Sequence, residues 1–159
     1  MLTAETSCYW YWTGQDIWDR QVTEAANAAL ELGQIELSGL RDVTGPTIFV
    51  PWITPENPGG KAWGQGRLVD APSEATLHTF VYDISGVKKV LLVIRSPKGE
   101  HRLDMHDLGP YPSRTGARLS AIYYRAKLPS GLGDVRYYIE AEDKRGNKSR
   151  SSLERVFLP

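Results

Sequence analysis

The C-terminal half of this chain alternates between strand-like segments and short turn signals, and this pattern restricts its fold more than any other feature. The segments are rich in β-branched and aromatic residues, and glycine, proline, serine, aspartate or asparagine separates them. Such spacing predicts a mainly β fold, an immunoglobulin/fibronectin-like antiparallel β-sandwich. The predicted strands are 76–82, 87–95, 120–127, 135–142 and 153–158.

Residues alternate in character along the strand 135–142, as expected when one face of a sheet is buried and the other is wet. Apolar Val135 and Ile139 alternate with Arg136 and Glu140. The tyrosines come as neighbours on strands, so one member of each pair is expected to face outward. The pairs are Tyr123 with Tyr124 and Tyr137 with Tyr138.

Before the sandwich, the sequence predicts one N-terminal α-helix packed against it. Apolar residues recur at helical spacing from Trp18 to Leu30, Thr13 with Asp16 is a plausible cap, and Gly33 is a plausible end. We therefore expect three regions: 1–37 as an aromatic segment plus helix, 38–74 as a Pro/Gly-rich connecting loop with a strand only near 47–50, and 75–159 as the sandwich.

Composition excludes several classes of function. The 159 residues carry 19 basic and 19 acidic side chains, a formal net charge of zero, which argues against a nucleic-acid partner. No apolar run is long enough to span a membrane. The single cysteine, Cys8, rules out an internal disulfide and a zinc site built on several cysteines. The first six residues lack the pattern of a signal peptide, so we expect an intracellular protein or a fragment, and the localisation stays undetermined.

No residue is assigned a catalytic or metal-binding role, and no cofactor is expected. The nucleophile motif Gly-x-Ser-x-Gly is absent, and Glu140, Glu142 and Asp143 are expected on solvated surface. Two histidines and two aspartates lie within residues 101–107, but their spacing matches no standard metal site. Whether calcium binds is left open.

Aromatic residues in loops are the strongest signal for a binding site. A sugar ring packs its C–H face on an aromatic ring while its hydroxyls seek polar partners. The candidate ligand-binding residues are Trp52, Trp63, Tyr111, Asn57, Gln65 and Lys61. The alternatives are that Trp52 and Trp63 clamp the loop onto the sandwich, or that outward tyrosines on one sheet form the sugar surface.

The N-terminal run from Ala4 to Trp12, AETSCYWYW, is similar to a motif near the C-terminal end of the catalytic region in glycoside hydrolase family 57. This chain has Cys8 and Tyr9 where the common form has Asp and Trp. The resemblance implies an α-glucan enzyme whose two catalytic carboxylates lie upstream of the motif in a (β/α)7 barrel. No residue of this chain would inherit those roles.

Together these observations predict a non-catalytic accessory region of a carbohydrate-active enzyme that binds α-glucan of the starch or glycogen type through exposed aromatics. The expected partners are the polysaccharide and the catalytic domain of a parent enzyme, with a homodimer through the N-terminal aromatic segment as a further option. One alternative is a purely structural sandwich that stabilises a glycoside hydrolase. Another is a small independent enzyme acting on glycans.

Overall fold

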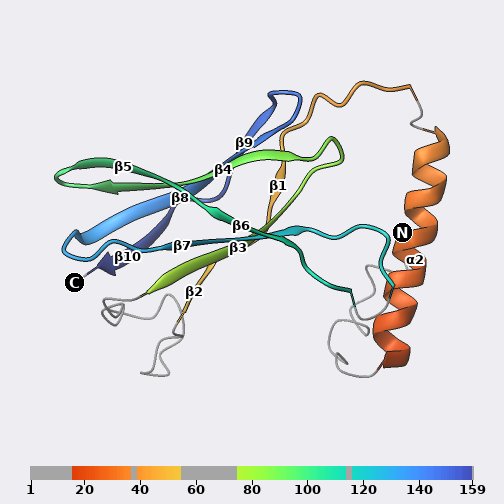
Figure 1. Ribbon diagram of the computed structural model, residues 1–159, viewed down its shortest axis with the longest axis horizontal. Helices are drawn as coiled ribbons and strands as arrows, with labels where there is room; N and C mark the ends of the chain where they lie inside the picture. Colours follow the sequence, from red (N-terminus) through yellow and green to blue (C-terminus); the bar gives the residue numbers. More distant parts are fainter. Residues whose placement is uncertain (1–15, 37–38, 55–74, 114–115, 159) are drawn as a thin grey trace. The chain divides into compact units, whose positions relative to one another are not determined.

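A computed structural model describes residues 16–36, 39–54, 75–113 and 116–158 of the 159-residue chain. The chain forms two compact units, each described below by itself. The first comprises residues 1–41 and 111–120, and the second comprises 42–110 and 121–159. All the strands of the described residues lie in the second unit (Figure 1).

One sheet, here called sheet A, has five antiparallel strands. Its order is β1 (Thr47–Ile48), β3 (Thr76–Tyr82), β7 (Ile122–Lys127) and β6 (His106–Pro110), and β2 (Trp52–Thr54) also pairs with β3. The registers of Ile48 with Val81 and of Trp52 with His78 attach β1 and β2 to the same strand. The segment between helix and sandwich therefore contributes two short strands to this sheet.

The other sheet, here called sheet B, is built around two long antiparallel strands. Its order is β10 (Glu154–Leu158), β8 (Gly133–Asp143), β4 (Val87–Ser96) and β5 (Gly99–Asp104), with β9 (Lys148–Arg150) also paired to β8. The central pairing sets Leu92 opposite Ile139. Strand β8 thus pairs with three other strands of this sheet, β4, β9 and β10.

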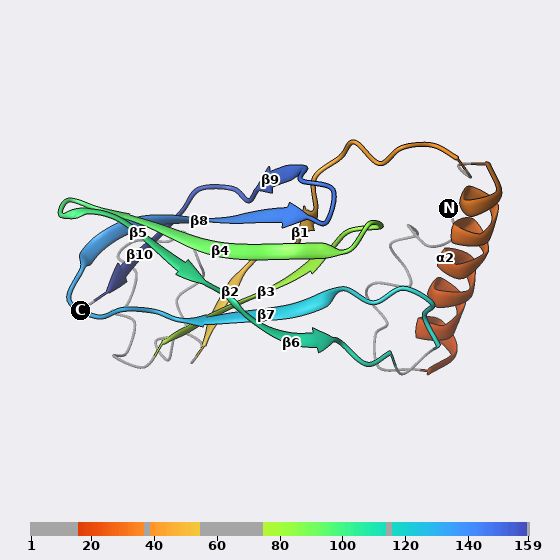
Figure 2. The same ribbon diagram turned by 45° about the horizontal axis from the view of Figure 1, so that its top comes forward.

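The two sheets lie face to face, and the chain passes from one to the other between β5 and β6 (Figure 2). Their inner faces bury a shared core because apolar residues recur at every second position of the central strands. Leu77, Leu92 and Ile139 are each fully buried in it. This confirms the predicted fold class, a mainly β protein with two antiparallel sheets and, among the described residues, one helix.

The alternation predicted for 135–142 is also confirmed. Val135, Tyr137 and Ile139 belong to the core, whereas Arg136 is exposed. Tyr124 and Tyr137 are the inward members of the two tyrosine pairs.

Four strands were not predicted from the sequence, and three of them, β5, β6 and β9, were missed because their residues are polar. Strands β5 and β6 read GEHRLD and HDLGP, and most of their positions are exposed. They lie at the ends of their strand orders, where a strand buries little apolar area and so carries little hydrophobic signal. The three-residue strand β9, KSR, is too short and polar to show periodicity.

Helix α2 spans Asp16–Glu36 and continues three residues past Gly33, so the predicted end at Gly33 is wrong. Its side chains contact the 111–120 segment within the first unit. The Asn27 amide donates to the Gly116 carbonyl at 3.1 Å and accepts from the Arg118 backbone N–H at 3.0 Å, while Arg118 pairs with Glu31 at 3.2 Å. A search of the described residues finds no helix with the length and apolar character of a membrane span.

Candidate functional site

Four rings from three strands gather on the outer face of sheet A: Trp52 of β2, His78 and Phe80 of β3, and Tyr123 of β7. We call them the aromatic cluster. Leu77 and Val81 point into the core, so the residues between them, at positions 78 and 80, point to the opposite face. The register then sets Trp52 beside His78 and Phe80 beside Tyr123.

Three rings of the aromatic cluster, those of Trp52, His78 and Tyr123, are nearly parallel. Trp52 stacks with His78 at a centroid distance of 5.3 Å and with Tyr123 at 6.0 Å, at interplanar angles of 17° and 5°. Phe80 is tilted by 37° against Trp52 and by 36° against Tyr123. These separations lie in the range of favourable aromatic pairs, so the rings hold one another in place.

A chain of hydrogen bonds fixes the histidine of the aromatic cluster. Nε2 of His78 bonds to Oγ1 of Thr54 at 2.6 Å, and Nδ1 bonds to the Tyr123 hydroxyl at 2.6 Å. Burial, and then the positive charge of Arg125, lower the pKa of His78 below its ordinary value of 6.5. A neutral imidazole offers one donor and one acceptor, so the tautomer sets the direction of the whole chain.

Polar and basic side chains continue the surface beyond the rings. Arg125 of β7 pairs in register with His78 on one side and with His106 of β6 on the other, and both Arg125 and His106 are exposed. A cavity of about 490 Å³ opens beside them. It is lined by Thr76, Leu103, Asp104, His106, Arg125, Ala126 and Lys127. Hydrogen-bonding groups therefore stand next to the aromatic cluster.

The six residues predicted to bind ligand lie in three different parts of the chain. Trp52 is half-buried in the aromatic cluster. Tyr111 is 58% exposed and belongs to the first compact unit, whereas the strands belong to the second. The other four, Asn57, Lys61, Trp63 and Gln65, lie outside the described residues, as does the segment 1–15 predicted to pair two copies, so these assignments stay predictions.

Sequence analysis did not assign His78 and Phe80 to a site, although a usable signal was present. The predicted strand 76–82 already placed positions 78, 80 and 82 on one face. The sequence analysis did not predict strand β2, because residues 52–54 were expected to belong to a connecting loop. Without its pairing to β3, nothing connected Trp52 with these rings.

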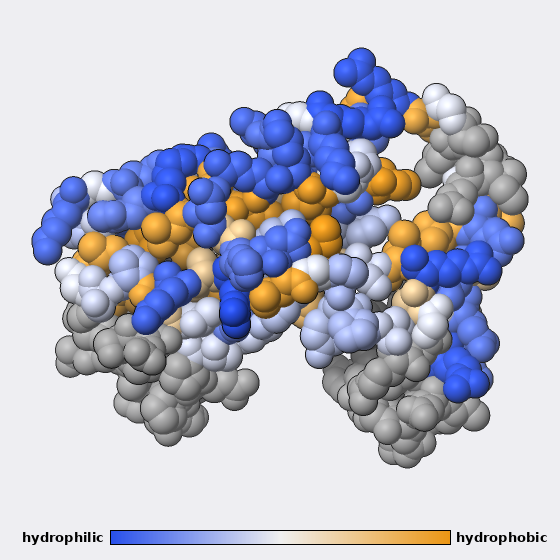
Figure 3. Space-filling view, in the orientation of Figure 1, coloured by the Kyte–Doolittle hydropathy of each residue, from blue (hydrophilic) through white to orange (hydrophobic). Residues whose placement is uncertain are grey.

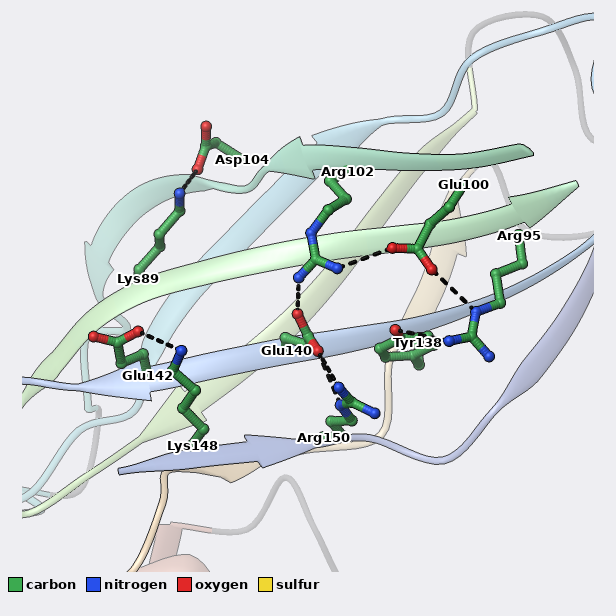
Figure 4. Close-up of polar contacts among 10 residues, drawn as sticks. All are labelled: Lys89, Arg95, Glu100, Arg102, Asp104, Tyr138, Glu140, Glu142, Lys148 and Arg150. Atoms are coloured by element: carbon green, nitrogen blue, oxygen red, sulfur yellow. Dashed lines mark hydrogen bonds and ion pairs between the residues drawn. The ribbon is translucent and has the colours of Figure 1, made fainter. Parts of the chain in front are cut away.

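The outer face of sheet B is covered by charged side chains that bind one another (Figure 4). Glu140 accepts from Arg102 and from Arg150, and Arg102 also binds Glu100 at 2.9 Å. Glu100 in turn accepts from Arg95 at 3.2 Å. Further pairs join Lys89 to Asp104, and Lys88 and Lys148 to Glu142. Figure 3 shows the hydrophilic residues (blue) gathered along the upper side of the sandwich.

Tyr138 lies on this charged face but is only 5% exposed. The guanidinium groups of Arg95 and Arg150 lie 5.2 and 5.3 Å from its ring centroid. Arginine stems cover apolar area while their heads stay wet, and cation–π attraction adds to the contact. Because Tyr123 is on sheet A and Tyr138 on sheet B, the two outward tyrosines do not form one platform on a single sheet.

A third group consists of carboxylates and lies at the β3–β4 and β8–β9 turns. Asp42, Asp83 and Asp143 each place one oxygen within 4.8 Å of the others. Asp143 is fully buried, so its predicted position on solvated surface is wrong. It faces inward because the hairpin it begins wraps its own N–H groups around the carboxylate.

Comparisons with known proteins give a fold likeness at low similarity. No family model matches the chain, and no curated protein matches it. A cycloalternan-degrading enzyme from Trueperella pyogenes, in complex with a covalent intermediate, is similar at 18% identity over 55% of this chain, with a TM-score of 0.42. Its structure with cycloalternan gives 16% identity, 51% coverage and a TM-score of 0.36.

The matched part covers 14% and 13% of the lengths of those two chains. A likeness at these identities and TM-scores supports no assignment of function to this chain. The resemblance to glycoside hydrolase family 57 stays a prediction, because no family model matches the chain.

Proposed function

We propose that the sandwich is a non-catalytic module that binds a glycan on the outer face of sheet A. The aromatic cluster is the observation that supports this function. It offers apolar ring surface from Trp52, held by neighbouring rings, and the exposed side chains of Arg125 and His106 continue the surface beyond it. A sugar needs both kinds of contact, a ring for its C–H face and polar groups for its hydroxyls.

An α-glucan is the first polymer to test, because the N-terminal motif resembles that of an α-glucan enzyme. Binding by one such site is expected to be weak, with a Kd of roughly micromolar to millimolar. In a parent enzyme, tethering by the module would raise the effective concentration of catalytic sites on the polymer.

Affinity electrophoresis of the purified chain tests this function. Native gels contain soluble starch, glycogen, xylan or a cellulose derivative, and mobility is compared with a polymer-free gel. We expect retardation by an α-glucan and its loss in Trp52→Ala. Tyr138→Ala is the matched control, an aromatic residue on the opposite face, and should be retarded like the wild type.

Two other outcomes would replace the proposal. If none of the polymers retards the chain, the aromatic cluster is packing surface and the structural alternative takes its place. Its near-parallel rings, which already cover one another, are the observation that favours that reading. If the isolated chain hydrolyses an α-glucan, the non-catalytic assignment fails.

A further inference from the structure

Three segments far apart in sequence bring their aspartates together at one end of the sandwich. Asp42 precedes β1, Asp83 begins the β3–β4 turn, and Asp143 ends β8. One carboxylate oxygen from each lies within 4.8 Å of the other two. Like charges at this separation repel, so the arrangement needs a compensating group.

Asp143 lies inside the protein, and its oxygens accept hydrogen bonds from the hairpin that it begins. Its side chain is fully buried, and Oδ1 accepts the backbone N–H groups of Arg145 and Asn147, both at 2.8 Å. Oδ2 accepts the Asn147 amide at 2.6 Å. Three donors of one hairpin therefore hold both oxygens of this carboxylate in place.

Asp42 carries an oxygen without a partner. Its Oδ1 accepts from the backbone N–H and the hydroxyl of Thr44, at 3.1 and 3.0 Å. Its Oδ2 exposes less than 1 Å² and has no hydrogen-bond donor. The nearby Ser85 hydroxyl gives its proton to Oδ1 of Asp83 at 2.7 Å. A buried carboxylate oxygen with no donor is costly and points to a missing ligand.

Among the described residues, neither lysine nor arginine forms an ion pair with Asp42, Asp83 or Asp143. The ammonium group of Lys88 binds Glu142 and none of the three aspartates. Within the described part of the chain, the negative charge of the three aspartates is therefore not balanced by an ion pair.

We propose that Asp42, Asp83 and Asp143 bind a calcium ion. All three donors are carboxylate oxygens, the ligands that hard divalent cations prefer. Oxygens that all lie within 4.8 Å of one another can share one ion at the roughly 2.3–2.6 Å typical of Ca²⁺. Ca²⁺ also accepts a flexible coordination geometry, whereas Mg²⁺ demands a nearly ideal octahedron. Water would complete the coordination shell.

Such an ion would join the segment that enters β1 to the two turns. That segment already docks on the β8–β9 hairpin: the Pro46 carbonyl accepts from the Ser149 hydroxyl, and the Asp42 carbonyl from the Asn147 amide at 3.4 Å. Gly45 lies so close to the Lys148 backbone that any Cβ would collide with it. Binding would thus be coupled to folding of the sandwich, independently of glycan binding.

Metal binding to the full chain, freed of metal with EDTA, tests the site directly. Isothermal titration with CaCl₂ measures affinity, and terbium luminescence excited through tyrosine and tryptophan reports occupancy. The variants are Asp83→Asn and, should that variant fail to fold by circular dichroism, Asp42→Asn. The matched control is Asp104→Asn, which removes a carboxylate that is 78% exposed and paired with Lys89 on sheet B.

We expect one saturable Ca²⁺ site in the wild type and in Asp104→Asn, with at least about tenfold weaker binding in Asp83→Asn or Asp42→Asn. At Ca²⁺ a hundredfold above Kd, Tm should rise by roughly 5–10 °C. Absence of saturable binding in the wild type, or equal affinity in all the variants, would overturn the proposal. Glycan retardation is measured separately, so failure of one proposal leaves the other standing.

Discussion

The two outer faces of the sandwich differ in the side chains that cover them. On sheet B, long charged side chains pair with one another, and Tyr138 is covered by two arginines. On sheet A, rings pack on rings, and Arg125 stands exposed beside them with no ion pair to any described residue. The charged face satisfies its own groups, whereas the aromatic face keeps apolar and polar groups that a ligand could engage. This contrast is the reason for placing the binding site on sheet A.

The largest effect should come from the core that both faces share. Ile139→Ala removes a fully buried side chain from β8 and should lower the free energy of unfolding by about 2–5 kcal/mol. Urea denaturation measures the loss. Leu153→Ala, at a residue that is 50% exposed, is the control and should change stability by less than about 0.5 kcal/mol. Comparable losses in the two variants would contradict the assignment of the core.

Aromatic residues on the two faces should separate stability from binding. Tyr138→Ala should lower the free energy of unfolding by about 2–4 kcal/mol, because this ring is almost fully covered. Half-buried Trp52 should cost less stability when truncated, about 1–3 kcal/mol, yet its loss should weaken glycan retention at least tenfold. Urea denaturation ranks the two variants by their loss of stability, and affinity gels rank them by their loss of glycan retention. The contrast between the faces breaks down if Tyr138→Ala loses retention as well.

Acid should weaken the aromatic face through His78. Its pKa is lower in the folded chain than the ordinary 6.5, so the folded state favours the neutral ring. The stability that this provides is complete above pH 6.5 and is lost as the pH falls through the folded pKa. The free energy of unfolding of the wild type should therefore fall more between pH 7.5 and 5 than that of His78→Gln. His106→Gln, at an exposed histidine, should follow the wild type; parallel curves for the wild type and His78→Gln would refute the assignment.

The smallest effect is expected on the charged face. Glu140→Gln removes a carboxylate that binds two arginines, but exposed ion pairs contribute little to stability. We expect Tm to fall by less than about 4 °C, and by less again in 0.5 M NaCl, where screening weakens the pairs. Thermal unfolding at the two salt concentrations measures this. A larger drop that salt does not reduce would mean that the network is structurally essential.

Much of the fold could be predicted from local patterns. Residues 76–82 and 135–142 carry enough alternating β-branched and aromatic residues to mark strands, and both are strands in the structure. The edge strands β5 and β6 could not be predicted, because strands with little buried area need few apolar residues. Of the candidate site, Trp52 was identified, whereas His78 and Phe80 were not.

Sequence by itself determined which face of a strand each residue occupies, because side chains alternate with a period of two. It thus separated Tyr123 from Tyr124 and Tyr137 from Tyr138. Tertiary structure decided which outward residues meet. Trp52 reaches His78 only through the pairing of β2 with β3, and Asp42 reaches Asp143 only when its segment docks on a distant hairpin. Strand register and the docking of segments depend on contacts between residues far apart in the chain. Such contacts cannot be predicted from a local sequence pattern.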